Sequence, residues 1–521
     1  MKSKRILLFL LIAATVLSVF AACSPAGPSV PGTSSGTPTQ QSTEPPTAEG
    51  DVSESDKKTT EPVTEPATDE NGYVLDHLPD DVDYGQRDFR IYAWNNIFNE
   101  FAPSATDTDH VSYAVFKRNA MVEERYGVHF TFSQTACDYY SQVDWVSSLE
   151  MILMAGAPDD KPDLCAGYSM TNMTLARDGF LQNLLECNYL DFNNPWWPAS
   201  LIKEASVGNK LYGASGDIAI SFFGEMFGYF MNKDLWSSFQ IDGDVIEDID
   251  DGSWTLEKMF SYANQVYADR TGDGVDMTDT FGLALSTVPL DTIIFGAQMK
   301  FVTTNDNGVF QVGVDAEDPD RGLNLIEMVT NNVWGQEACV YTDETAEIRQ
   351  AFMDGRLLFY PNAIQILGEM RESGLDCDYY VLPSPKYDEE QKTYSSNVGF
   401  QMTMWCIPTN GRDTDMPALV MEALASTAYR ITTPAYYEKK VKTRFSGSEE
   451  ANIRMFDLLR DTACFDKTRF LYRLLEDRSM NPISTMRTCI SNDSATWASK
   501  IATIRMKLAY FLRDEITPMF Q

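Results

Sequence analysis

Aromatic and amide side chains meet at the end of an alternating segment near residue 94. Residues 88–94 (DFRIYAW) alternate in the manner of a β-strand, and the segment stops at Asn95 and Asn96. An aromatic ring can cover the C–H face of a hydroxylated ligand, while a few placed polar groups fix its orientation. Trp94, Asn95 and Asn96 are therefore candidate ligand contacts. In the alternative interpretation, Trp94 packs inside a sheet and the asparagines form a turn.

Two further places combine bulky and polar side chains. Tyr168 and Ser169 follow a short apolar segment and are candidates for the same role. Glu225 stands between bulky apolar residues in the segment 222–226 (FFGEM). Its carboxylate either accepts hydrogen bonds from ligand hydroxyls or pairs with a lysine or arginine.

The sequence singles out no residues for catalysis. A glycosidase needs two carboxylates at a defined separation, and no pair can be chosen among 76 acidic residues. The motifs GxSxG and HExxH do not occur between residues 76 and 521, and the three histidines, His77, His110 and His129, have no metal-binding spacing. We therefore expect a protein that binds rather than an enzyme.

An acidic, glycine-containing loop at residues 269–279 partly fits the start of a calcium-binding EF-hand loop. Asp269, Thr271 and Asp273 occupy its first, third and fifth positions, and Asp276 adds a carboxylate. The twelfth position is a threonine instead of the usual glutamate. We expect either a structural calcium ion held by these four residues or a solvated turn, and no other cofactor.

The beginning of the chain has the pattern of an export signal, residues 1–22. Three basic residues precede a charge-free, mainly apolar run, and Ala21 and Ala22 precede Cys23. This ending resembles the bacterial lipobox, which implies that Cys23 carries a lipid anchor; an ordinary cleaved signal is the alternative. Residues 23–75 are mostly Ser, Thr, Pro, Gly and Glu, so they are predicted to form a disordered tether.

Composition excludes some partners. A formal net charge of -35 argues against nucleic acid, because phosphate binding needs clustered Lys and Arg. No second apolar run approaches the length of a membrane span. Eight of the nine cysteines follow Cys23 without a CxxC pair, and their disulfide pairing stays open.

The elements that must position these side chains alternate between strand and helix patterns. Residues 88–94, 128–134 and 163–168 are predicted strands, with helices at 112–126 and 143–155 between them. This order implies a mostly parallel sheet, which binds ligands beyond the carboxyl ends of its strands. Further strands are predicted at 210–213, 218–231, 357–361, 379–382 and 401–408, and further helices at 255–268, 322–332, 345–353, 417–433 and 497–514.

Five short motifs follow the tether in a fixed order. They are residues 162–168 (PDLCAGY) with 179–181 (GFL), 229–235 (YFMNKDL), 253–257 (SWTLE), 352–358 (FMDGRLL) and 381–386 (VLPSPK). Their content and order resemble those of the extracellular solute-binding proteins of ABC importers, family 1, the class that includes maltose- and oligosaccharide-binding proteins. Each motif alone is weak, and five in register are specific.

The resemblance implies an α/β fold of the two-lobed periplasmic-binding-protein type II (Venus-flytrap) kind, with an extra helical C-terminal region. One lobe would comprise residues 76–228 and 383–433, and the other 229–382 and 434–521. It also implies that closure of the lobes captures a small solute, a sugar or oligosaccharide, for delivery to an ABC-transporter permease. Tyr360 and Asn362 occupy positions where the family places contacts from the second lobe.

Other functions stay open at this point. They are a surface glycan-degrading enzyme, an adhesion lipoprotein, and a binder of peptides or polyamines, for which acidic charge would concentrate in the cleft. We expect a monomer, held by its lipid anchor at the extracellular face of a bacterial membrane or in the periplasm.

Overall fold

The computed structural model describes residues 67–521 except 105, 413 and 448. The predicted signal peptide, the lipidation of Cys23 and most of the predicted tether lie outside these residues. The end of the predicted tether is folded: residues 67–75 form a turn closed by a bridge between Thr68 and Val74, and the Tyr73 ring meets the Tyr429 ring edge-on at 5.3 Å. Residues 67–75, which were predicted as the end of the tether, thus have local structure and contact α14 through Tyr73.

A four-stranded sheet has the order β13-β3-β1-β2, where β1 is Arg87–Trp94, β2 Val128–Thr135, β3 Leu164–Tyr168 and β13 Thr403–Cys406. β1 pairs in parallel with β2 and β3, and β13 is antiparallel to β3. Helices α1 (His110–Tyr126) and α2 (Gln142–Ala155) connect the parallel strands, as predicted. Asp109 starts α1 by accepting from two backbone amides, and Gly127 ends it at φ 59°.

A six-stranded sheet has the order β11-β4-β10-β6-β5, with β9 also paired to β6. Its strands are β4 Phe227–Asn232, β5 Tyr267–Ala268, β6 Thr280–Leu285, β9 Cys339–Tyr341, β10 Leu357–Ala363 and β11 Tyr379–Leu382. Every residue of β4 and β6 is buried, as expected for strands covered on both faces. The helices of this part are α6 Lys233–Ser238, α7 Val245–Asp251, α8 Leu256–Ala263, α9 Leu290–Gly296, α10 Val314–Glu317, α11 Asp320–Val333, α12 Thr345–Met353 and α13 Ile366–Glu372.

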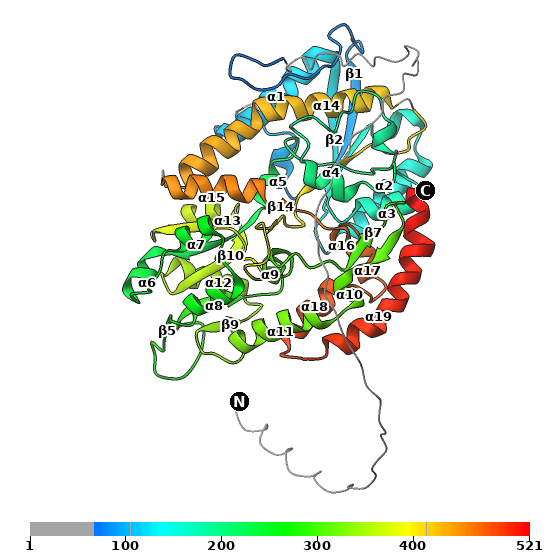
Figure 1. Cartoon of the computed structure of the whole chain (residues 1–521). Coiled ribbons are helices and arrows are strands. Elements are labelled where there is room, and N and C mark those ends of the chain that lie inside the picture. The colour runs from blue at the N-terminus through cyan, green and yellow to red at the C-terminus, as the bar shows by residue number, and fades with distance from the viewer. Residues whose placement is uncertain (1–66, 105, 413, 448) are drawn as a thin grey trace, which may run out of the picture. The chain divides into compact units, whose positions relative to one another are not determined.

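The last hundred residues are mainly helical and reach both sheets. Helix α14 packs against α1, α15 packs against β11, and α18 and α19 pack against α11 (Figure 1). Lys467 donates to the backbone oxygen of Glu204 at 3.0 Å. The C-terminal region therefore also contacts helix α4 (Ala199–Ala205), which follows the first three strands of the four-stranded sheet. The helices are α14 Asp415–Arg430, the π-helical η4 Pro434–Phe445, α15 Glu450–Asp461, α16 Lys467–Phe470, α17 Tyr472–Glu476, α18 Pro482–Ser491 and α19 Trp497–Phe511.

The remaining elements are short. Two small sheets pair β7 with β8 and β12 with β14. The bounds are β7 Val302–Thr304, β8 Phe310–Val312, β12 Ser396–Asn397, β14 Ala463–Cys464, α3 Asn172–Arg177, α4 Ala199–Ala205, α5 Ile220–Gly224, η1 Phe98–Glu100, η2 Pro158–Asp160, η3 Leu184–Glu186, η5 Leu512–Ile516 and η6 Thr517–Phe520.

Three predicted elements differ from the structure. Residues 210–213 form no strand and carry one isolated bridge, from Lys210 to Val207. The predicted strand 218–231 begins as helix α5, and α8 ends at Ala263 instead of residue 268. The apolar run in 218–231 is buried on all sides, so its pattern could not distinguish a helix from a strand.

Two further predictions concern membrane spans and the cysteines. Across residues 67–521, as far as they are described, no helix has both the length and the apolar character needed to cross a membrane. The eight cysteines of this part are free thiols, and Cys165 and Cys406 lie opposite each other on β3 and β13.

Glu422 organises the polar interior beneath α14. Its Oε1 atom accepts from the Asn194 amide at 2.8 Å and from the Trp196 indole at 3.0 Å, and Oε2 accepts from the Trp197 indole at 2.9 Å. Burial raises the pKa of Glu422 to about 7. The carboxyl group therefore serves as the common acceptor for three donors that would otherwise be buried without partners.

We expect Glu422→Leu to lower the free energy of unfolding by about 2–5 kcal/mol, because two indole N–H groups and one amide lose their acceptor. Urea unfolding followed by circular dichroism measures this change. Glu124→Leu, at an exposed position of α1, is the matched control and should change stability by less than about 1 kcal/mol. Equal effects of the two substitutions would contradict the assignment.

Candidate ligand-binding site

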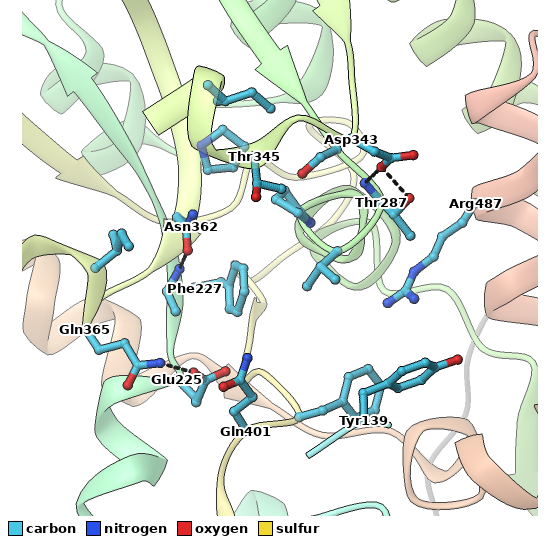
Figure 2. Close-up of a pocket in the computed structure, with 18 of the residues that line it drawn as sticks. Tyr139, Glu225, Phe227, Thr287, Asp343, Thr345, Asn362, Gln365, Gln401 and Arg487 are labelled. Carbon is cyan, nitrogen blue, oxygen red and sulfur yellow. Dashed lines mark hydrogen bonds between the residues drawn. The ribbon is translucent and has the colours of Figure 1, made fainter. Parts of the chain in front are cut away.

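A cavity of about 770 Å³ is lined by residues from both large sheets and from the C-terminal helices. Figure 2 shows Glu225, Gln401 and Tyr139 on one side, Thr345, Asp343 and Thr287 on the other, and Arg487 entering from the C-terminal helices. The aromatic side chains of the lining are Tyr139, Tyr140, Tyr168, Phe227, Tyr360, Phe400 and Tyr472. The cavity therefore combines apolar walls with separate polar groups.

Glu225 lies where the chain passes from the first sheet to β4. The segment runs beside a second crossing, because Gly399 N donates to the Glu225 backbone oxygen at 2.6 Å and Met226 forms a bridge with Val398. The Glu225 side chain is 3% exposed and accepts a hydrogen bond from Gln365 (Figure 2). Burial raises the pKa of Glu225 to about 7. Near neutral pH this carboxyl can both donate and accept hydrogen bonds.

Tyr360 and Asn362, on β10, also line the cavity. The Asn362 amide donates to the Tyr360 hydroxyl at 2.6 Å. The Tyr360 ring packs against Phe230 and Phe352, with ring centres 6.0 and 5.5 Å away, and is 4% exposed. It therefore offers a ligand its polar edge and not its face.

The first sheet contributes Tyr168 and its surroundings. Tyr168 lines the cavity, although little of its ring is exposed. Ser169 does not line it; its hydroxyl donates to the Phe400 backbone oxygen at 2.7 Å. Ser169 thus acts by positioning Phe400, which does line the cavity.

The loop after β1 lies outside the cavity lining. Trp94 is 1% exposed, and its indole donates to the Thr403 hydroxyl at 3.0 Å. Asn95 is exposed to solvent, and Asn96 accepts from the Cys137 amide at 2.9 Å. Trp94, Asn95 and Asn96 therefore do not line this cavity; the Trp94 ring packs inside the sheet, as in the alternative interpretation of the sequence. Asn96 instead holds the loop that carries Tyr139 and Tyr140.

That loop presents two tyrosines at the cavity. Their rings meet edge-on at 5.4 Å, and Tyr140 is 89% exposed. Asp138 fixes the loop by accepting from the backbone amides of Tyr140 and Ser141, both at 2.9 Å. We did not predict these residues from the sequence, although the sequence shows two adjacent tyrosines directly after Asp138.

The C-terminal helices form the third wall, which the sequence reading also missed. Arg487 makes a bidentate pair with Asp291 of α9, at 2.9 and 2.6 Å, and Arg469 contacts the same carboxylate at 3.4 Å. Arg487 also donates to the Tyr472 hydroxyl at 3.1 Å. Asp291 is 1% exposed, so the pair with Arg487 is a buried one.

The acidic loop does not gather its carboxylates. Asp269 accepts from the backbone amides of Thr271 and Gly272, the Thr271 hydroxyl bonds to Asp273, and Asp276 accepts from the Thr278 amide at 2.7 Å. No group of three or more His, Cys, Asp or Glu side chains suited to a metal ion occurs among the residues that the structure describes. Calcium binding by this loop stays a prediction.

Comparisons with known proteins show the fold. No protein-family model matches the chain, and no curated protein does either. Among solved structures, the sugar-binding protein MalE from Xanthomonas citri is similar with a TM-score of 0.55 and 12% identity, over 82% of this chain and 97% of that one. An ABC substrate-binding protein from Listeria monocytogenes, in complex with cycloalternan, gives 0.51 and 12%, over 81% and 98%. UgpB from Mycobacterium tuberculosis, in complex with glycerophosphocholine, gives 0.52 and 12%, over 83% and 99%.

The chain therefore has the two-lobed α/β fold of ABC solute-binding proteins, as the sequence motifs implied. Its two large sheets have four and six strands, and the cavity is lined from both. How the segments of the chain divide between the lobes stays a prediction.

We expect Asp291→Ala to lower the free energy of unfolding by about 3–5 kcal/mol, because two buried guanidinium groups lose their counter-charge. Asp250→Ala is the control: Asp250 pairs with Arg454, and both side chains are 49% exposed. Such an exposed pair contributes about 1 kcal/mol or less. Chemical unfolding of both variants measures the difference, and similar losses would show that the Asp291 pairs do not stabilise the fold.

Glu225→Gln should change how stability depends on pH. The folded-state pKa of about 7 lies above the ordinary 4.5, so ionisation in the unfolded state lowers stability as pH rises between these values. The glutamine variant lacks this loss, so its stability relative to the wild type should increase from pH 5 to pH 8, by on the order of 3 kcal/mol at most. Glu257→Gln, at an exposed position, is the control. Parallel pH profiles for wild type and Glu225→Gln would refute the account.

Proposed function

We propose that this chain is an extracellular solute-binding protein that holds a sugar or oligosaccharide in the cavity between its two lobes and delivers it to an ABC-transporter permease. The observation that carries the proposal is the cavity itself, about 770 Å³, lined from both sheets by aromatic rings and carboxamides. Ligand pockets commonly have volumes of about 300–1,000 Å³. The fold supports the proposal, and two of the three compared proteins are described as sugar-binding or as bound to a carbohydrate.

The polar groups suit hydroxyls. Asn362, Gln365 and Gln401 bring carboxamides, which donate and accept, and Glu225 brings a carboxyl group that is partly protonated near pH 7. The rings of Tyr139, Tyr140 and Phe400 offer apolar surface. A ligand rich in hydroxyls but with C–H faces matches both kinds of surface.

Capture by closure follows from how the walls are distributed. Because the walls come from both sheets, a bound solute contacts both lobes and favours the arrangement in which they approach. Glu225 and Gly399, in the two adjacent crossing segments, lie where such a movement would turn. The closed form would be the one that a permease recognises.

We extend the proposal to the cellular location. A lipid on Cys23 and a tether ending near residue 67 would hold the folded part at the outer face of the cell membrane. Two acyl chains suffice for stable anchoring where one is marginal.

A glycan-degrading enzyme is the second candidate, since its site would also hold carbohydrate. Glu225, the most buried carboxyl among the acidic lining residues, is held by Gln365 and lies beside a chain crossing, where it is constrained by backbone contacts. We therefore favour binding over hydrolysis. Incubation with oligosaccharides separates the two: a saturable thermal shift without products supports the binder, and products that accumulate with time support the enzyme.

For an oligosaccharide that binds the wild type, we expect Gln401→Ala to lower the affinity about tenfold, because a carboxamide that reaches the cavity is lost. Isothermal titration measures the affinity. Gln336→Ala, an exposed glutamine that does not line the cavity, is the matched control and should bind as the wild type does. Unchanged affinity in Gln401→Ala would place the ligand elsewhere.

A further inference from the structure

The charges of the cavity lining are strongly unequal. Four carboxyl groups, Glu225, Asp343, Glu369 and Glu476, line it against one cation, Arg487. The positive charge of Arg487 is already engaged, because its guanidinium makes two bonds to buried Asp291 and one to the Tyr472 hydroxyl. An anionic ligand would therefore meet carboxylates without gaining a free cation.

Two of the carboxylates are held by hydroxyl and amide groups instead of cations. Asp343 accepts from the Thr287 amide at 3.2 Å, from the Thr287 hydroxyl at 2.8 Å and from the Tyr341 hydroxyl at 3.0 Å (Figure 2). Although burial alone would raise the pKa of Asp343, these hydrogen bonds lower it overall. Asp343 is therefore ionised near neutral pH and fixed in orientation.

Glu476 is arranged in the same way on the third wall. Its Oε2 atom accepts from the Ser484 hydroxyl at 2.6 Å, and the Ser484 hydroxyl in turn lies 2.8 Å from that of Tyr472. Neutral donors orient a carboxylate without cancelling its charge. Neither Asp343 nor Glu476 forms an ion pair with a Lys, Arg or His of the part of the chain that the structure describes. In contrast, Glu369 is paired with Arg349 at 3.0 Å.

From this arrangement we infer that the cavity selects a glycan that carries free amino groups, with Asp343 and Glu476 as the residues that recognise its ammonium. The inference rests on the proposed function and narrows its ligand class. Each of the two carboxylates can accept a charge-assisted hydrogen bond from an ammonium group of the glycan, while the aromatic rings and carboxamides contact the sugar rings. Uronic acids and sugar phosphates are disfavoured, because they bring like charge to ionised carboxylates.

The aromatic walls separate this ligand from a simple polyamine. Tyr139, Tyr140 and Phe400 provide ring surface that a flexible aliphatic chain uses less well than the C–H face of a sugar ring does. Gln401 and Asn362 add carboxamides that can bond to the hydroxyl groups of a sugar, and a polyamine has no hydroxyl groups. We therefore commit to an amino-bearing oligosaccharide.

The test compares four probes by isothermal titration on the full chain: a β-1,4-linked glucosamine trimer, its N-acetylated form, a uronic acid trimer and spermidine. We expect the glucosamine trimer to bind about tenfold or more tightly than the N-acetylated trimer, with the preference falling as salt rises. The uronic acid trimer and spermidine should bind most weakly.

Substitutions test whether Asp343 and Glu476 cause the preference for the free amine. Asp343→Asn and Glu476→Gln keep the shapes of the side chains and remove their charges, so each should reduce the preference for the free amine while binding of the N-acetylated trimer stays near the wild-type value. Glu257→Gln, which removes an exposed carboxylate that does not line the cavity, should leave the preference unchanged. Thermal unfolding of each variant checks that it is folded.

The outcomes distinguish a failure of this inference from a failure of the proposed function. Equal affinity for the glucosamine and N-acetylated trimers, or a preference that survives both charge-removing substitutions, overturns this inference and leaves the proposed function standing. Spermidine binding in the absence of saccharide binding overturns both. A protein that binds none of the probes but shows a saturable shift with other neutral oligosaccharides also overturns the inference alone.

Discussion

The site depends on the buried ion pairs that the Asp291 carboxylate forms with Arg487 and Arg469. Ions taken out of water carry a large desolvation cost, which is recovered only where counter-charges and hydrogen bonds are well placed. Arg487 and Arg469 supply them, from α18 and α16, and so fasten the C-terminal helices to α9. Because Arg487 also holds Tyr472, one connected set of contacts leads from this ion pair to the cavity wall.

The same ion pairs decide the charge that a ligand meets. Both guanidinium groups are engaged with Asp291, and Arg469 also lies over the Phe400 ring at 4.1 Å. The cavity is thus left with carboxylates oriented by hydroxyls, among aromatic rings. On the proposed function, a site of this composition would favour neutral or positively charged sugars over acidic ones. The ion pairs that stabilise the third wall would then also be the reason that anionic ligands are disfavoured.

Much of the fold could be predicted from the sequence, and less of the site. Of the predicted residues, Tyr168, Tyr360 and Asn362 line the cavity, and they lie on or beside strands that local patterns and motifs reveal. Trp94 packs inside the sheet, and periodicity could not decide between this position and one at the cavity. The third wall could not be predicted at all: Asp291 and Arg487 are 196 residues apart, and no local pattern records that they meet.

On the proposed function, one solute contacts both lobes and the C-terminal wall at once. Hydrogen–deuterium exchange, with and without a saturating oligosaccharide, measures these contacts segment by segment. We predict slower exchange in three separate segments, 137–141, 360–366 and 472–491, each of which contributes residues to the cavity. Protection in only one of these segments, or only in segments remote from the cavity, would contradict the claim.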